Sequence, residues 1–175
     1  MSELDKKAER FISGLEALKE NRGAMADVRR GFSRTSGYRA WPWIAAWCNL
    51  DNDRDRGITQ SVAAAYATHP QNITDGNLGT VFRGIALGSG AGKTALASFD
   101  GLFRRFLACQ SALEVCRLLP GVIRAAKTRG IPVNYRELYK NLYYWSGKGI
   151  ERVRARWARE YWGRWEEPEA GEGKR

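Results

Sequence analysis

The segment Gly88–Thr94, which reads GSGAGKT, has the composition of a nucleotide-binding loop. That loop needs four residues between its first glycine and the Gly-Lys-Thr end. Here Gly88 leaves only three residues before Gly92, and Leu87 stands where the glycine belongs. A loop one residue shorter cannot surround a β-phosphate with the same ring of backbone N–H groups. The spacing therefore argues against ATP binding and favours a flexible linker before a helix.

Other residues with catalytic or metal-binding chemistry are scarce. His69 is the only histidine, and no activated nucleophile stands near it in the sequence. A zinc site needs about four Cys or His ligands at short spacing, whereas Cys48, Cys109 and Cys116 form no such cluster. We expect these cysteines to be buried reduced thiols. The sequence predicts no catalytic residue, no metal and no cofactor.

Arginine and tryptophan are concentrated near the C-terminus. Residues Ile150–Trp165 hold five arginines and three tryptophans in sixteen positions. At about 100° per helical residue, one face collects the apolar side chains, which are Ile150, Val153, Trp157, Tyr161 and Trp165. The opposite face collects Arg152, Arg156 and Arg159. This pattern predicts an amphipathic helix whose cations favour a polyanionic partner.

Positive charge is clustered along the chain, which has 175 residues and a net charge of +10. Residues 101–165 hold fourteen lysines and arginines against four acids, a net charge equal to that of the whole chain. Residues 22–40 add five arginines against Asp27. Such clustering is what a phosphate-binding surface requires.

Apolar residues recur at helical spacing throughout, and no period-two pattern persists. We therefore expect an all-α protein, a two-lobed helical bundle of about eight to nine helices without a significant sheet. We expect a first helix over residues 4–19 that Asn21-Arg22-Gly23 ends, since glycine tolerates a left-handed cap, and a second helix over Ala24–Phe32. We expect Asn134 to cap a later helix. Trp145 and Trp157 lie on apolar faces, so core packing is favoured over base stacking, whereas Trp162 is free to reach a partner surface.

Four glycines between residues 84 and 92 indicate a boundary. We expect an N-terminal helical lobe (1–87), a Gly-rich linker (88–94), a basic helical bundle (95–165) and a disordered charged tail (166–175). No segment approaches the ~20 apolar residues of a membrane span, and the N-terminus lacks the apolar run of a signal peptide. We expect a cytoplasmic protein with no membrane partner.

Five short motifs in a fixed order resemble the CasB family, the small subunits of the type I-E CRISPR Cascade surveillance complex. The motifs are Asn21-Arg22-Gly23-Ala24 with Val28-Arg29-Arg30, Asn77-Leu78-Gly79 with Phe82-Arg83, Cys116-Arg117-Leu118-Leu119, Ile131-Pro132-Val133-Asn134-Tyr135 with Leu138, Leu142 and Trp145, and Val153-Arg154 with Trp157-Ala158 and Tyr161-Trp162. They extend over nearly the whole chain.

The resemblance implies a non-enzymatic, all-helical subunit of a prokaryotic complex. In the family, a pair of small subunits contacts the backbone and large subunits. The pair helps to hold the guide RNA–target DNA hybrid and the displaced DNA strand through a basic surface. Basic family motifs match Arg29, Arg30, Arg117, Lys148 and Arg152. One further family arginine corresponds to either Arg104 or Arg105.

The resemblance and the charge pattern together predict one set of nucleic-acid-binding residues. These are Arg29, Arg30, Arg104, Arg105, Arg117, Arg124, Lys148, Arg152, Arg156 and Arg159. A surface ion pair is the alternative for any single one of them. Two other functions stay open: a stand-alone helical DNA-binding regulator, and a nucleotide-dependent enzyme built on Gly88–Thr94.

Overall fold

A computed structural model describes residues 1–88 and 93–163, and within these ranges every regular element is helical. The elements are α1 (Glu3–Ala17), α2 (Arg22–Arg29), η1 (Arg30–Phe32), η2 (Gly37–Ala40), α3 (Trp41–Ile44), α4 (Asp53–Thr68), α5 (Leu78–Gly88), α6 (Lys93–Ala108), α7 (Ala112–Arg129), α8 (Tyr135–Tyr143) and α9 (Gly149–Trp162). The only β-pairing in these ranges is an isolated bridge between Asn72 and Val133. The predicted all-α class is confirmed.

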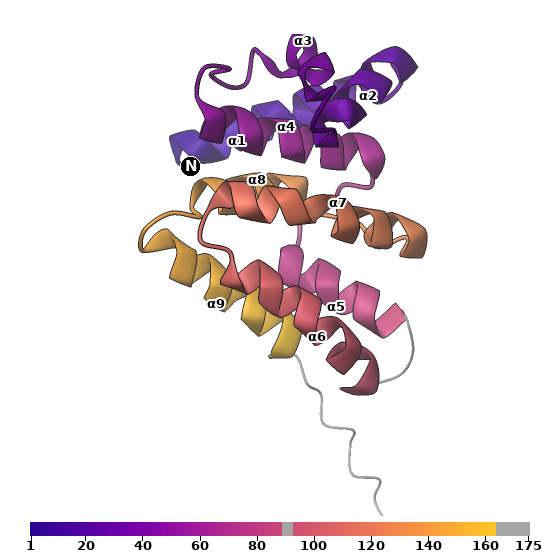
Figure 1. Ribbon diagram of the computed structural model, residues 1–175, viewed down its shortest axis with the longest axis vertical. Coiled ribbons are helices and arrows are strands. Elements are labelled where there is room, and N and C mark those ends of the chain that lie inside the picture. Colours follow the sequence, from indigo (N-terminus) through magenta and orange to yellow (C-terminus); the bar gives the residue numbers. More distant parts are fainter. Residues whose placement is uncertain (89–92, 164–175) are drawn as a thin grey trace, which may run out of the picture.

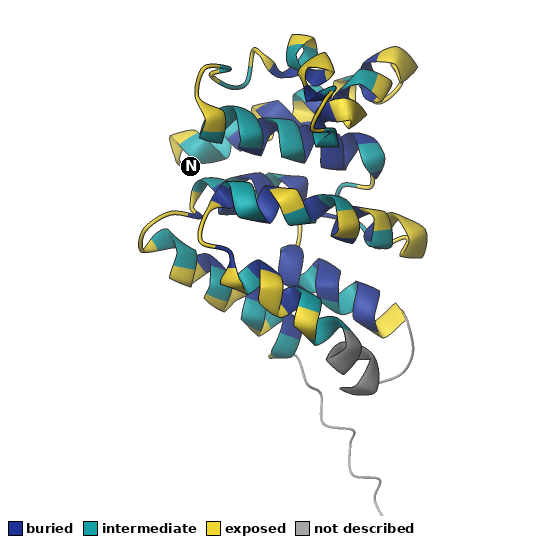
Figure 2. Cartoon of the chain, in the orientation of Figure 1, coloured by how far each residue is buried: buried dark blue, intermediate teal, exposed yellow. Residues whose placement is uncertain are grey.

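The helices form three tiers, which Figure 1 shows from top to bottom. The upper tier contains α1 to α4, the middle tier contains α7 and α8, and the lower tier contains α5, α6 and α9. Helix α4 packs on α7 and α8, while α5 contacts α7 from below and packs on α6 and α9. Buried residues face the neighbouring tiers, and exposed residues face outward (Figure 2).

The helix ends follow local hydrogen bonding. Ser2 and Asp5 form a reciprocal capping box at the start of α1. The Asn134 side chain accepts a hydrogen bond from the Glu137 N–H at 2.9 Å, which confirms the predicted cap of α8. Gly130 ends α7 in the left-handed conformation at φ 65°.

The prediction for Gly23 is wrong. Helix α1 ends at Ala17, and Asn21 caps the next helix by accepting a hydrogen bond from the Ala24 N–H at 3.0 Å. Gly23 therefore lies inside α2, and its φ is not positive. The Asn21 side chain thus begins α2 at Arg22, two residues before the predicted start at Ala24.

Chain segments on both sides of the predicted boundary share one core. Helix α5 lies before that boundary, yet it packs on α6 and α9, which follow it. Most of the predicted linker and the whole predicted tail (166–175) lie outside the described residues. The division into lobes stays a prediction.

Helix α9 is anchored through its apolar face, as predicted. Val153, Trp157 and Tyr161 are buried and Ile150 is half-buried, whereas Trp165 of the predicted face lies outside the described residues. The Trp157 ring lies 4.9 Å from the Trp145 ring, and its indole N–H donates to the Asn141 side chain at 2.6 Å. Both tryptophans thus belong to the core, and the helix exposes Arg152, Arg156 and Arg159.

Close packing of α5 on α9 depends on one glycine. A Cβ added at Gly79 would lie 2.1 Å from the backbone oxygen of Trp157, which cannot rotate away. We expect Gly79→Ala to lower the free energy of unfolding by about 1–3 kcal/mol, the usual range for overpacking. Urea unfolding measures the change.

Gly121→Ala is the matched control, because nothing lies within 4 Å of a Cβ at this helical position. That substitution should raise the free energy of unfolding by about 0.5–1 kcal/mol. Equal stability of Gly79→Ala and the unmodified protein would contradict the packing argument.

A polar cluster joins α1, α4 and α8. The Asp55 carboxylate accepts hydrogen bonds from the Tyr143 hydroxyl and from the Asn49 N–H, and Lys7 Nζ lies 3.2 Å away. Burial alone would raise the pKa of Asp55, but these three partners together lower it below its ordinary value of 3.8. The charged carboxylate is therefore favoured in the folded state.

The lowered pKa of Asp55 has a consequence for acid stability. The unfolded chain takes up a proton at a higher pH than the folded chain, so this contribution is present at neutral pH. We expect it to be lost as the pH falls below about 3.8. Thermal unfolding against pH checks this, and Asp55→Asn should show a shallower acid decline. An unchanged decline in that variant would contradict the assignment.

Candidate nucleic-acid interface

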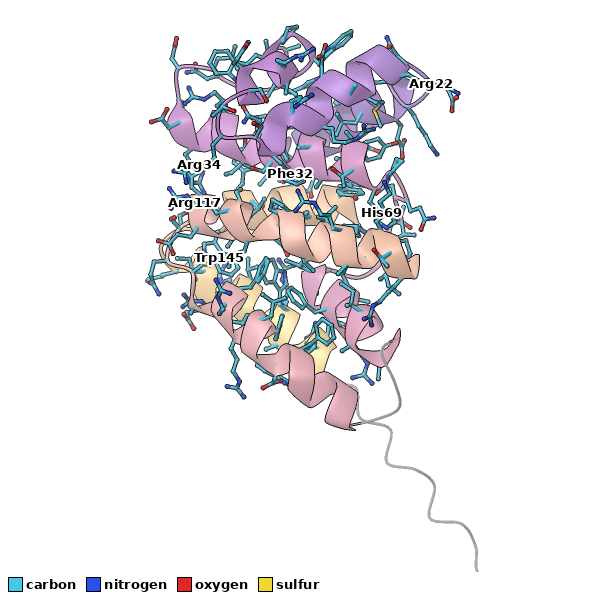
Figure 3. All side chains as sticks on the ribbon, turned by 45° about the vertical axis from the view of Figure 1, so that its right-hand side comes forward. Arg22, Phe32, Arg34, His69, Arg117 and Trp145 are labelled. Carbon is cyan, nitrogen blue, oxygen red and sulfur yellow. The ribbon has the colours of Figure 1, made fainter. Side chains whose placement is uncertain are left out.

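A groove of about 900 Å³ runs between η1, α4 and α7. Its lining residues are Gly31, Phe32, Ser33, Arg34, Asp53, Arg56, Gly57, Gln60, Ser61, Leu113, Cys116, Arg117 and Pro120. Arg34 and Arg117 are exposed and lie next to each other in Figure 3. Arg56 forms an ion pair with Asp53, the only acidic residue among those that line the groove. The groove therefore carries two uncompensated cations.

Two glycines bring the walls of this groove together. A Cβ at Gly31 would lie 2.9 Å from the Gln60 backbone oxygen, so η1 approaches α4 closely. A Cβ at Gly57 would lie 2.4 Å from the Leu113 side chain, where α4 meets α7. The Gln60 amide also donates to the Gly31 carbonyl at 2.9 Å. These contacts hold Arg34 opposite Arg117.

A second, smaller pocket of about 420 Å³ lies where the α1–α2 turn meets the end of α7. It is lined by Lys19, Arg22, Met25, Arg29, Ala67, Thr68, Pro70 and Lys127. Four of these residues are cationic and none is acidic. Arg29 Nε donates to the Ala67 carbonyl at 3.1 Å, which orients its guanidinium group. Like charges gathered in one pocket repel each other, so an anion is the occupant that stabilises it.

Helix α7 connects the two sites. Arg117 lines the groove, Lys127 lines the pocket, and the exposed Arg124 lies between them on the same side of the helix. At 1.5 Å per residue, Arg117 and Lys127 are about 15 Å apart along the axis. We call Arg22, Arg29, Arg34, Arg117, Arg124 and Lys127 the α7 basic strip.

The other predicted residues are not among those that line the groove or the smaller pocket. Arg30 directly follows Arg29 and is exposed in η1, and Arg105 is exposed on α6. Arg104 donates to Asp100 at 2.8 Å and lies over the Trp162 ring. Figure 1 places α9 in the lower tier, so its cations are remote from those of α2 in the upper tier.

The α9 cations differ in their partners. Lys148 and Arg152 are exposed and form no ion pair with any residue in 1–88 or 93–163. Arg156 lies 3.2 Å from Glu137, and Arg159 lies 4.0 Å from Glu160. The predicted set thus divides into a group on α2 and α7, around Arg29, Arg117 and Arg124, and a group at the start of α9, around Lys148 and Arg152.

Sequence reasoning missed several residues of these sites. Arg22, Arg34 and Lys127 were not predicted as binding residues, although they stand in the two segments richest in positive charge. Local charge density was the available signal. The pairing of Arg34 with Arg117 depends on tertiary packing, which no local pattern reports.

Trp162 and His69 are less exposed than their positions in the sequence suggest. Trp162 is half-buried, and its indole N–H donates to Asp100 at 2.7 Å, so it faces α6. His69 is buried although its segment is polar, and its Nε2 lies 2.7 Å from the Ile131 carbonyl. Both residues bind elements of this chain to one another.

The residues that could support catalysis or nucleotide binding, Cys116 and the Gly-rich segment, lie in surroundings that do not favour that chemistry. Burial raises the pKa of the Cys116 thiol to about 12, so the thiolate is disfavoured at neutral pH. The element before the Gly-rich segment is helix α5, whereas a phosphate-binding loop follows a strand. Residues 89–92 of that segment lie outside the described residues. Among the described residues, no three His, Cys, Asp or Glu side chains are grouped to hold a metal ion.

The family model of the CRISPR-associated protein Cse2 matches residues 24–162. The chain belongs to the Cse2 family. This confirms the resemblance to CasB that the sequence motifs indicated. A search of curated protein sequences finds no match.

Solved structures agree with this assignment. CasB from Thermus thermophilus has 26% sequence identity and a TM-score of 0.68, with 93% of this chain and 99% of that chain covered. A second structure from Thermus thermophilus, a CRISPR-associated protein of the Cse2 family, has 24% identity and a TM-score of 0.71, covering 89% and 97%. A chain of a CRISPR RNA-guided surveillance complex shares the fold at 19% identity and a TM-score of 0.67, covering 90% and 92%.

The crowding of cations in the smaller pocket predicts stabilisation by anions. At about ten times its dissociation constant, inorganic phosphate should add about 1.4 kcal/mol to the free energy of unfolding. Lys127→Ala should reduce this gain because it removes one of the four cations. Thermal unfolding at matched ionic strength in chloride and in phosphate makes the comparison.

Lys6→Ala is the control, since Lys6 lies 2.8 Å from Glu3 on α1 and lines neither of these sites. It should retain the full phosphate effect. An equal gain in phosphate for Lys127→Ala would contradict the anion assignment.

Proposed function

We propose that this protein is a non-catalytic small subunit of a CRISPR RNA-guided DNA surveillance complex. It binds the nucleic-acid backbone through basic surfaces and stabilises the guide RNA–target DNA R-loop in antiviral defence. The α7 basic strip is the observation that carries the proposal, because six cations from three parts of the chain converge there. Membership of the Cse2 family supports the assignment to such a complex.

The chemistry of the strip suits phosphate rather than base edges. Five of its six members are arginines, whose planar guanidinium groups bind phosphate oxygens in a bidentate way. Contacts to phosphate position a strand without reading its sequence. In an RNA-guided complex, base pairing with the guide carries the sequence information. A protein surface that supplies charge and shape is sufficient for this role.

The proposed partners are the guide RNA–target DNA hybrid, the displaced DNA strand, the backbone and large subunits, and a second copy of this chain. The structural relative from a CRISPR RNA-guided surveillance complex supports assembly with other subunits. The proposed location is the cytoplasm of a prokaryote. No described helix is long and apolar enough to cross a membrane.

The rival function is a stand-alone DNA-binding regulator. Such a protein would insert a short recognition helix into the major groove, with polar side chains at its N-terminal end reading base edges. The cations of the strip instead come from α2, α7 and the loop after η1. A sequence-specific footprint on duplex DNA by the isolated chain would favour the regulator and contradict the proposal.

Loss of charge should weaken retention of target DNA by the assembled complex. Arg117→Ala combined with Arg152→Ala removes one exposed cation from each group. The slope of log K against log salt is about −0.7 to −0.9 per phosphate contact. Two lost contacts should therefore flatten that slope by about 1.5, and filter binding across a salt series measures it.

Arg10→Ala combined with Arg39→Ala is the matched control. It removes the same charge from two exposed arginines that line neither the groove nor the smaller pocket, and Arg39 already lies 3.0 Å from Asp27. Its salt slope should stay that of the unmodified complex. Unchanged affinity and slope in the Arg117/Arg152 variant would overturn the assignment of these residues, and failure to co-purify with a guide RNA complex would overturn the proposed function.

A further inference from the structure

A third groove, of about 540 Å³, lies beside the start of α9. It is lined by Tyr144, Gly149, Arg152, Val153, Ala155 and Arg156. This volume falls within the range of about 300–1,000 Å³ found for small-molecule sites. Its walls combine an aromatic ring, small aliphatic groups and two guanidinium groups, and none of the described lining residues is acidic.

Tyr144 is a large aromatic residue left in contact with solvent, with an exposed fraction of 44%. The backbone that carries it is firmly held. Its N–H donates to the Lys140 carbonyl at 3.0 Å, and its carbonyl accepts from the Ser146 N–H at 2.8 Å. A Cβ at Gly149 would lie 2.2 Å from that same carbonyl oxygen, so only glycine permits the approach. The ring therefore projects from a rigid turn.

Positive charge lines and flanks this groove: Arg152 and Arg156 line it, and Lys148 directly precedes the lining residue Gly149. Lys148 and Arg152 are exposed and unpaired within the described ranges. The nearby acids already have partners, because Glu151 lies 2.6 Å from Arg154, and Glu137 lies close to both Lys140 and Arg156. An anion bound at this edge would meet free cations.

We propose that this groove binds an unpaired nucleotide, with its base stacked on the Tyr144 ring and its flanking phosphates at Lys148 and Arg152. The inference rests on the proposed function and adds a base-contacting site to it. An exposed aromatic ring beside cations is the combination that single-stranded nucleic acids require, because every base offers a face for stacking. In a duplex the base faces are covered by their neighbours, so a paired nucleotide would meet only the cations.

An acidic protein segment is the competing occupant. Carboxylates would satisfy Lys148 and Arg152, but they would leave the Tyr144 ring and the apolar wall without a matching group. A nucleotide supplies the anion and the flat apolar face in one molecule. The mixed lining of the groove therefore favours the nucleotide.

The experiment compares two fluorescent oligonucleotides that carry equal numbers of phosphates, oligo(dT) and its abasic counterpart, with the full-length chain. We expect the unmodified protein to bind oligo(dT) about ten-fold more tightly, within the range for one stacked base. Tyr144→Ala should abolish this preference and leave abasic binding unchanged, whereas Tyr144→Phe should retain it. A 5-iodouracil oligonucleotide should cross-link to Tyr144, located by mass spectrometry.

Tyr38→Ala is the matched control, since Tyr38 is more exposed, at 61%, and lines none of the three basic sites. It should keep the preference for oligo(dT). The stacking site would be overturned if Tyr144→Ala kept the preference for oligo(dT) over the abasic oligonucleotide, or if the unmodified protein showed no such preference. Either result would leave the proposed function intact.

Two further results separate the remaining cases. A poly-glutamate peptide whose binding depends on Tyr144, with no preference for bases over abasic sites, would identify an acidic protein segment and overturn the inference. Failure of both oligonucleotides to bind, at every salt concentration, would overturn the proposed function and the stacking site together.

Discussion

The approach of α4 to its neighbours is the constraint on which the other features depend. Six consecutive positions in the second half of this helix, Val62–Ala67, are buried, so that half is surrounded on all sides. Gly31 and Gly57 allow η1 and α7 to come within contact distance of it. Both the groove at Arg117 and the pocket at Lys127 include α4 in their walls. A larger side chain at either glycine would separate the two walls and move the cations apart.

The large positive charge of the chain is the second constraint on the structure. Some arginines have partners within the fold, and others are left in solvent. Where an arginine serves the structure, it has a partner: Arg154 donates to the Cys109 carbonyl at 2.9 Å and ties α9 to the end of α6. Arg54 similarly donates to the Tyr143 carbonyl at 2.7 Å and ties α4 to α8. Arg117, Arg124 and Arg152 have no such role in the described structure and remain in solvent. Even a paired surface cation adds little to stability, so these three arginines contribute little to the fold and are available to the proposed ligand.

Local patterns in the sequence were sufficient for the helices but not for the sites. The spacing of Val153, Trp157 and Tyr161 predicts a buried face, and burial confirms it. Asn134 predicts a cap because the interaction involves residues three positions apart. The prediction for Gly23 was wrong because a glycine near a helix end is compatible with both an end and a start. The hydrogen bond from the Ala24 N–H to the Asn21 side chain decides for the start of α2.

The proximity of Arg34 and Arg117 could not be predicted from local patterns, since these residues are more than eighty positions apart and α4 lies between their elements in the groove. The separation of the predicted cations into a group on α2 and α7 and a group at α9 was hidden for the same reason.

The α7 basic strip and the groove at Tyr144 differ in chemistry as well as in place. The α7 basic strip offers guanidinium and ammonium groups along about 15 Å of helix, and such a surface suits a nucleic acid that presents only its backbone. The groove at Tyr144 adds an exposed ring and an apolar wall, which suit a strand whose bases are free. An R-loop contains both kinds of strand, a paired hybrid and a displaced single strand. Under the proposed function, one rigid subunit distinguishes the two kinds of strand without reading sequence, because base pairing itself decides which of its two surfaces each strand can satisfy.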